Sequence, residues 1–152
     1  MKVMNIKIEE NIHQIPERIF PWVAEPEKAM KWQKNVKSGE IIKKEPSIIG
    51  TTFKEEIEED GNTLVMFGKI IKYEENKTIG FHLESKVHKF DVNYSLEATR
   101  ELTRFIIEVE IHWKFPMNFV CLFIGKKIKD NLKRQLKLEV SELRKYCEDM
   151  EK

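Results

Sequence analysis

The chain has 152 residues, 41% of them hydrophobic, enough for one substantial core and too few for two ordinary domains, so we expect a single domain over residues 1–152. Its 27 basic and 26 acidic residues leave a net charge of +1, which offers no electrostatic argument for binding nucleic acid through a concentrated basic surface. No run approaches about 18 apolar residues and the N-terminus lacks the apolar core of a signal peptide, so the expected location is the cytoplasm.

The first fifty residues predict one strand, two short helices and a second strand. Apolar and polar residues alternate from Met4, which is the period of a half-buried strand, and this strand ends near His13. Pro16 suits the first turn of a helix, because the N–H that proline lacks is unbonded there in any case. Further prolines keep the helical segments short. The expected elements are helices over residues 16–23 and 26–32 and a strand over residues 36–44.

Five more strands are expected before the C-terminal helix, each with one apolar face. Phe53 and Ile57 share a face of the first of them, and Asp60-Gly61 is the clearest hairpin pattern in the chain. The other strands alternate with the same period of two. These strands span residues 51–59, 63–73, 78–85, 90–96 and 103–113.

Residues 117–150 predict one long amphipathic helix. Apolar residues recur there in steps of three or four, which places them on one face, and charged residues fill most of the remainder. The apolar positions are Met117, Cys121, Ile124, Ile128, Leu132, Leu136, Val140, Leu143, Cys147 and Met150. The simplest partner for so long a stripe is a curved sheet. We therefore predict an α+β fold in which an antiparallel sheet of about seven strands wraps around the C-terminal helix and can enclose a cavity.

Three short motifs add a resemblance to a known family. They are Ile12-His13-Gln14-Ile15-Pro16-Glu17-Arg18-Ile19-Phe20, Ala24-Glu25-Pro26-Glu27 followed by Trp32, and Gly50-Thr51-Thr52-Phe53. They resemble three motifs of the START-like (SRPBCC) superfamily: the motif at its N-terminal end, its Asp-Pro-Glu followed by a Trp, and its Gly-Thr-x-apolar. This superfamily includes polyketide cyclase/dehydrase-like and lipid-transfer proteins. The resemblance implies a helix-grip fold with a deep apolar cavity between the sheet and the last helix.

The inward-facing residues include many aromatic rings, which support a cavity wall but would equally fill an ordinary core. Glu55 lies between two apolar positions on the same face, where its carboxylate would be desolvated unless it is paired or touches a ligand. A place at the cavity mouth, or a β-bulge that turns Glu55 outward, remains an alternative. The candidate ligand-binding residues are Trp32, Phe53, Glu55, Phe67, Phe81, Phe90, Tyr94, Phe105, Trp113, Met117, Cys121 and Ile124.

Residues 115–124 are apolar on nearly every side. If the helix stripe faces the cavity, Phe119 and Phe123 point elsewhere and something must cover them. The rings could be buried under the short helices or the second and third strands. Alternatively, they form a homodimer contact or a portal lip that touches a membrane transiently with the help of the lysines that follow.

Catalytic and metal-binding motifs are missing from the sequence. The four histidines are scattered, and we find no His-Glu-x-x-His, paired Cys-x-x-Cys, nucleophile elbow or phosphate loop, so we expect no metal and no cofactor. The favoured function is binding, or transport, of a hydrophobic small molecule or lipid. One alternative is a cyclase or dehydratase-type enzyme in which Glu55 moves a proton with Tyr94 or His88. The other is an interaction protein similar to the family's chaperone-ATPase activators.

Overall fold

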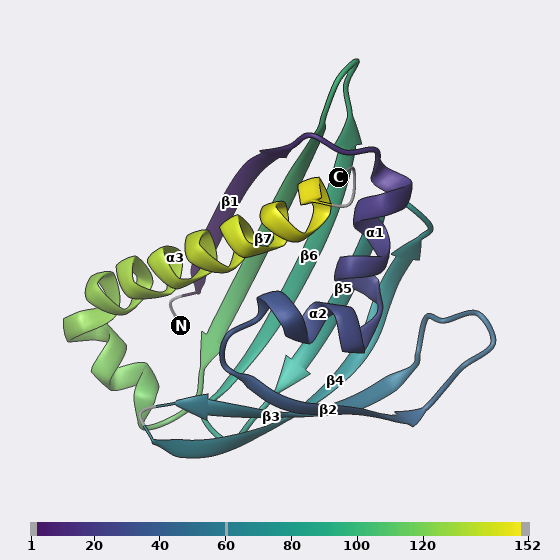
Figure 1. The fold of residues 1–152 in the computed structure, drawn as a ribbon. Coiled ribbons are helices and arrows are strands. Elements are labelled where there is room, and N and C mark those ends of the chain that lie inside the picture. The colour runs from purple at the N-terminus through teal and green to yellow at the C-terminus, as the bar shows by residue number, and fades with distance from the viewer. Residues whose placement is uncertain (1–2, 60, 150–152) are drawn as a thin grey trace.

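The computed structural model describes residues 3–59 and 61–149 and contains a seven-stranded antiparallel sheet that curves around a long C-terminal helix (Figure 1). The elements are β1 (Met4–Ile12), α1 (Pro16–Ala24), α2 (Pro26–Trp32), β2 (Val36–Lys43), β3 (Thr52–Glu59), β4 (Asn62–Glu74), β5 (Thr78–Glu84), β6 (His88–Ala98), β7 (Thr103–Trp113) and α3 (Met117–Asp149). This order confirms the predicted α+β helix-grip architecture.

The strands lie in the order β1-β7-β6-β5-β4-β3-β2. From β2 to β7 each strand therefore pairs with its neighbour in the sequence, and β1 adds to the free edge of β7. The two short helices carry the chain from β1 at one edge of the sheet to β2 at the other (Figure 1). This connection brings the end of α2 over the concave face, on the same side as α3.

The hairpin predicted between the third and fourth strands is present. Glu59 and Asn62 are the last paired residues of β3 and β4, and Gly61 has a φ of 80°, which glycine adopts without steric cost. Asp60 lies outside the described residues. The hairpin sets the register that places Phe53 opposite Gly68 across the two strands.

The core lies between the concave face of the sheet and the C-terminal half of α3. β7 buries every second residue from Thr103 to Ile111, as expected for a strand with one covered face, and Ile106 between them is buried too. From α3, Val140, Leu143 and Cys147 are buried in the same cluster. Trp32 closes the core from the end of α2, and its indole Nε1 donates a hydrogen bond to the carbonyl oxygen of Trp22 at 2.7 Å.

The predicted long C-terminal helix is present, but it changes direction near its start. Ile124 has non-helical backbone angles (φ −122°, ψ 16°), and the first turns of α3 run at an angle to the rest (Figure 1). Gly125 follows directly. Among the amino acids only proline has a lower helix propensity than glycine, so a helix is readily interrupted at this position. The apolar stripe is therefore buried only after the kink, and its last predicted member, Met150, lies outside the described residues.

Replacement of Leu143 by alanine is expected to lower the free energy of unfolding by about 2–5 kcal/mol, because truncation of a buried leucine leaves a space that its neighbours fill only in part. Leu138 lies on the same helix and is 53% exposed, so Leu138→Ala is the matched control and should cost less than about 0.5 kcal/mol. Urea unfolding measures both changes. Equal losses in the two variants would contradict the packing of α3 described above.

Candidate functional site

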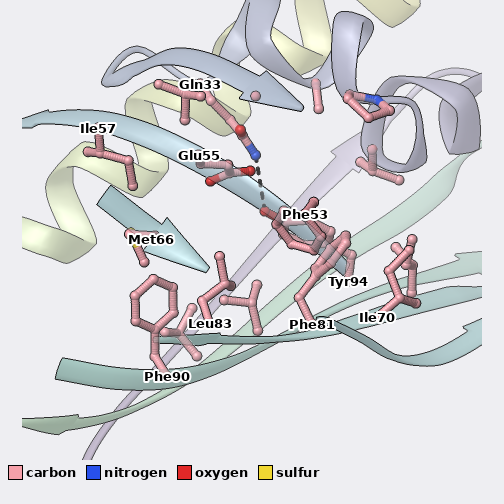
Figure 2. Close-up of a pocket in the computed structure, with 18 of the residues that line it drawn as sticks. Gln33, Phe53, Glu55, Ile57, Met66, Ile70, Phe81, Leu83, Phe90 and Tyr94 are labelled. Carbon is pink, nitrogen blue, oxygen red and sulfur yellow. Dashed lines mark hydrogen bonds between the residues drawn. The ribbon is translucent and has the colours of Figure 1, made fainter. Parts of the chain in front are cut away.

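A cavity of about 500 Å³ opens between the concave face of the sheet and the layer formed by α2 and α3. Strands β2 to β7 supply its floor and walls, and α3 covers it with Leu132, Gln135, Leu136 and Glu139. Figure 2 shows the side chains of several strands converging on this space. Most of the lining is apolar, so the few polar groups among it mark where a ligand would be held by hydrogen bonds or charge.

Aromatic rings form one wall of the cavity. Phe81 contacts both Phe53 and Tyr94 edge to face, with ring centroids 5.7 Å and 5.8 Å apart. Such geometry places the positive edge of one ring against the negative face of the next. Tyr94 in turn contacts Phe105 and Trp32 in the core behind it. The wall is thus anchored to the most deeply buried part of the protein.

Phe53 owes its position to a glycine on the neighbouring strand. A Cβ atom at Gly68 would clash with three carbon atoms of the Phe53 ring, so the ring occupies the space that a side chain at this position would take. Glycine in a strand commonly marks such a close approach. The pairing of Phe53 with Gly68 therefore shapes the cavity near β3 and β4.

Among the β3 side chains that the structure describes, Glu55 is the one carboxylate that lines the cavity. It follows Phe53 by two residues and precedes Ile57 by two, so all three share the inner face, as predicted. Burial raises the pKa of Glu55 from 4.5 to about 7. Among the described residues no hydrogen bond or salt bridge joins Glu55 to a partner, and in Figure 2 its carboxylate points into the same space as the amide of Gln33.

A second carboxylate, Glu139 of α3, lines the same cavity and is only 6% exposed. Its Oε2 accepts a hydrogen bond of 3.4 Å from Nε2 of Gln135, one turn earlier on the helix. Burial raises the pKa of Glu139, and the hydrogen bonds from Gln135 and from the backbone N–H of Lys34 oppose that rise. The helix thus presents an acidic group to the cavity from the side opposite the sheet.

The hydroxyl of Tyr94 connects these groups. Nε2 of Gln33 donates a hydrogen bond of 3.4 Å to it (Figure 2). Burial raises the pKa of Tyr94, and the charges of Glu139 and Glu55 raise it further. Both carboxylates therefore lie close enough to this phenol for their charges to act on it.

His88 lies among the rings at the start of β6 and is buried. Its ring contacts Phe90 and Trp113, and its Nδ1 is 2.8 Å from the hydroxyl oxygen of Ser85. Burial lowers the pKa of His88, which favours the neutral imidazole. The hydrogen bonds of His88 go to Ser85 and none to Glu55 or Tyr94, so the described contacts do not make it a proton partner of either group.

Half of the predicted ligand-binding residues line the cavity. They are Phe53, Glu55, Phe81, Phe90, Tyr94 and Trp113. Trp32 and Phe105 do not, because both are fully buried behind Tyr94 and support the wall from the core side. That the six lining residues bind a ligand remains a prediction.

Four other residues that were predicted to line the cavity do not line it. Phe67 is 56% exposed, because it follows Met66, which points inward, and successive strand residues face opposite sides. Apolar residues occupy both faces of this strand, so the alternation alone did not reveal the inner one. Met117, Cys121 and Ile124 precede or form the kink in α3, and this turn of the helix does not reach the cavity.

Several polar lining residues were not predicted, and three of them, Glu139, Gln135 and Gln33, make hydrogen bonds inside the cavity. Glu139 stands three residues after Leu136 and directly before Val140, so its place on the buried face was recognisable from the helical period. Gln135 precedes Leu136 in the same stripe. Gln33 is different: it follows the last residue of α2, and only the crossing of this helix over the sheet brings its amide to Tyr94.

The first turns of α3 and the residue two positions before the helix carry an exposed apolar patch, which consists of Phe115, Phe119, Leu122, Phe123 and Ile124. The possibility that Phe119 and Phe123 are buried under neighbouring elements is wrong, since these rings are 55% and 86% exposed. Homodimer formation and transient membrane contact through the patch stay predictions. Within residues 3–59 and 61–149, no helix is both long enough and apolar enough to cross a membrane.

No protein-family model matches the chain, and no curated protein matches its sequence. Many solved structures nevertheless have the same arrangement of strands and helices. A START superfamily protein from Mycobacterium smegmatis has a TM-score of 0.79 at 16% identity, with 96% of this chain and 98% of that chain covered. Zhui aromatase/cyclase from Streptomyces sp. R1128 has a TM-score of 0.80 at 7% identity, with 99% and 97% covered. Ara h 8.0201 has a TM-score of 0.72 at 19% identity, with 96% and 98% covered. The chain therefore has the START-like fold that its short motifs resemble.

Replacement of Glu55 by glutamine is expected to stabilise the protein at about pH 8, by on the order of 2–3 kcal/mol, and to have no such effect below about pH 4. The folded protein holds the proton of Glu55 more tightly than the unfolded chain, because its pKa is about 7 rather than 4.5. The stability that this group contributes is therefore complete below the lower value and is lost as the pH rises through the higher one.

Urea unfolding of both proteins across this pH range measures the difference. Glu56→Gln changes the neighbouring residue, which faces away from the cavity, and is the matched control. A stability gain of Glu55→Gln that is the same at about pH 4 and about pH 8 would show that the carboxylate is not desolvated.

Proposed function

We propose that the protein binds a hydrophobic small molecule or lipid in the cavity between its sheet and α3. The observation that carries this proposal is a space of about 500 Å³ with a mainly apolar lining and a few convergent polar groups. This size falls within the roughly 300–1,000 Å³ that is usual for small-molecule sites. A well-packed core would leave few spaces larger than a water molecule. The shared fold with a START superfamily protein and an aromatase/cyclase supports the proposal at a general level.

The cavity suits an occupant that is mainly apolar. Its lining includes Tyr73 and Ile70 of β4, Phe81 and Tyr94 of the aromatic wall, and Trp113 at the end of β7. Each square ångström of apolar surface that a ligand removes from water contributes about 25 cal/mol. An aliphatic or ring skeleton is therefore the part of the ligand that supplies most of the binding energy.

Decanol is expected to raise the thermal midpoint of the protein, because a ligand that binds only the folded state stabilises it by about 2.7 kcal/mol at 100 times its dissociation constant. Val92 lies on the wall between Phe90 and Tyr94, and Val92→Phe should fill part of the cavity and weaken decanol binding about tenfold or more. Val120→Phe, a change at an exposed position, is the control.

Circular dichroism establishes that each variant is folded before binding is measured. Native mass spectrometry of the protein from its own host then shows whether an apolar compound travels with it. Decanol affinity that is unchanged in a folded Val92→Phe protein would place binding outside the cavity.

An enzyme that moves a proton is the second candidate function. The observation that favours it is Glu55, a carboxylate whose pKa of about 7 suits a general base or acid near neutral pH, next to the buried phenol of Tyr94 in an apolar site. One of the structures with this fold is an aromatase/cyclase. In this candidate mechanism the ionised Glu55 removes a C–H proton from a bound substrate and returns it after the electrons of that bond have moved.

Nitrobenzisoxazole tests this candidate without knowledge of the natural substrate. A base that takes its ring C–H proton leaves the bond electrons to form a nitrile while the N–O bond breaks to give a phenolate. The rate should rise through about pH 7 as Glu55 ionises, and should fall by a factor of about 10² or more in Glu55→Gln but not in Glu56→Gln. A rate no greater than that in buffer would count against a catalytic Glu55.

A further inference from the structure

We infer that the polar part of the cavity, formed by Glu55, Glu139, Tyr94 and Gln33, binds the ammonium group of a ligand whose remaining part is apolar. The ligand class is thus a hydrophobic amine. This inference rests on the proposed binding function and adds the chemistry of the polar end of the ligand.

The four residues come from separate elements and meet at one space. Glu55 comes from β3, Tyr94 from β6, Glu139 from α3, and Gln33 from the residue after α2. The hydrogen bond from Gln33 to Tyr94 links the layer above the cavity to the sheet below, and Figure 2 shows the carboxylate of Glu55 directed toward the same region. A ligand group at this point would therefore be surrounded by protein oxygen atoms from above and below.

These groups provide more acceptors than donors. Both oxygens of Glu55 lack a hydrogen-bond partner among the described residues, whereas the amide of Gln33 already donates to Tyr94 and that of Gln135 to Glu139. Buried carboxylates are normally paired, because an unpaired one is costly to desolvate. A ligand that donates hydrogen bonds would meet this need, and one that only accepts them would not.

The charge of Lys34 favours the ionised form of Glu139, but among the described residues no cation pairs with Glu55. Among the salt bridges of the described residues none involves Glu55 or Glu139, although fourteen others join charged side chains elsewhere. Lys34 and Lys44 are the nearby basic residues, and both side chains are exposed to solvent. Glu55, which is half-buried, therefore places a negative charge in the cavity when it ionises, and a cationic ligand group can balance this charge.

The aromatic wall is a second feature that suits an ammonium group. Phe53, Phe81 and Tyr94 are in edge-to-face contact beside Glu55, which follows Phe53 by two residues on the same strand face. Aromatic faces attract a cation through the ring quadrupole, by about 2 kcal/mol when water is excluded. An ammonium group also supplies three N–H donors, whereas a hydroxyl supplies one and a carboxylate none.

Charge predicts how the affinity depends on pH. The titratable groups that line the cavity are Glu55, Glu139, Tyr94, Tyr73 and His88. Glu25, Glu40 and Lys44 also line it but are exposed to solvent, and Lys34 lies beside Glu139. Of these, Glu55 has a pKa of about 7, so its ionised fraction rises about tenfold between about pH 6 and pH 8. An alkylamine remains protonated over this range, as lysine does with a pKa of about 10.4. A bound ammonium group should therefore be held about ten times more tightly at the higher pH.

Isothermal titration calorimetry with decylamine, decanol and decanoate, which share one chain length, tests the inference. We expect decylamine to bind at least tenfold more tightly than decanol at about pH 8, decanoate to bind most weakly, and only decylamine to gain affinity between about pH 6 and pH 8. Glu55→Gln should remove both the preference for the amine and its pH dependence, and Glu139→Gln should reduce the preference. Glu56→Gln and Glu142→Gln, which change residues outside the cavity on the same two elements, should leave both unchanged.

Decanol that binds as tightly as decylamine, or decanoate that binds best, would overturn the inference and leave the proposed binding function intact. Binding of none of the three compounds would contradict the proposed function itself. The pH dependence of the wild-type protein needs no variant, so the inference is tested even if a substituted protein fails to fold.

Discussion

The contact between α3, beyond its kink, and the sheet is the interaction on which the rest of the structure depends. Leu143 and Cys147 are fully buried there. Hydrogen bonds anchor the same end of the helix to the segment after β1, since Nε2 of Gln14 donates to the carbonyl oxygen of Cys147 and the side chain of Glu148 accepts from the backbone N–H of His13. This end of the helix cannot move without opening the core.

The cavity exists because that contact covers only part of the sheet. The sheet curves away from α3 toward β2, and the helix meets it closely at the β1 side (Figure 1). Leu132 and Leu136 face the resulting space and are only partly buried. Before the kink no described residue of the helix is buried, and Phe123 is exposed. One helix therefore has three environments along its length: core, cavity roof and solvent.

Burial of Glu55 and Glu139 in this space costs the protein stability, because desolvation raises the pKa of both carboxylates and only Glu139 has partners that oppose the rise. Such a cost is common where polar groups are arranged for function rather than for folding. The two proposed functions, binding and proton transfer, would use the same property of Glu55. A cation would stabilise the ionised form of Glu55. An apolar substrate would leave the pKa of Glu55 near neutral, so that both its protonated and its ionised form are present.

Residue periodicity in the sequence determined the elements and their order. A period of two identified the strands, steps of three and four identified α3, and the inward direction of Phe53 and Glu55 followed from the alternation within β3 alone. The tertiary structure decided which surfaces face empty space. Phe105 and Tyr94 both point inward, yet only Tyr94 lines the cavity, and Gln33 reaches it because α2 crosses the sheet. Periodicity reports on neighbours along the chain, whereas a cavity is volume left unfilled between segments that are distant in sequence.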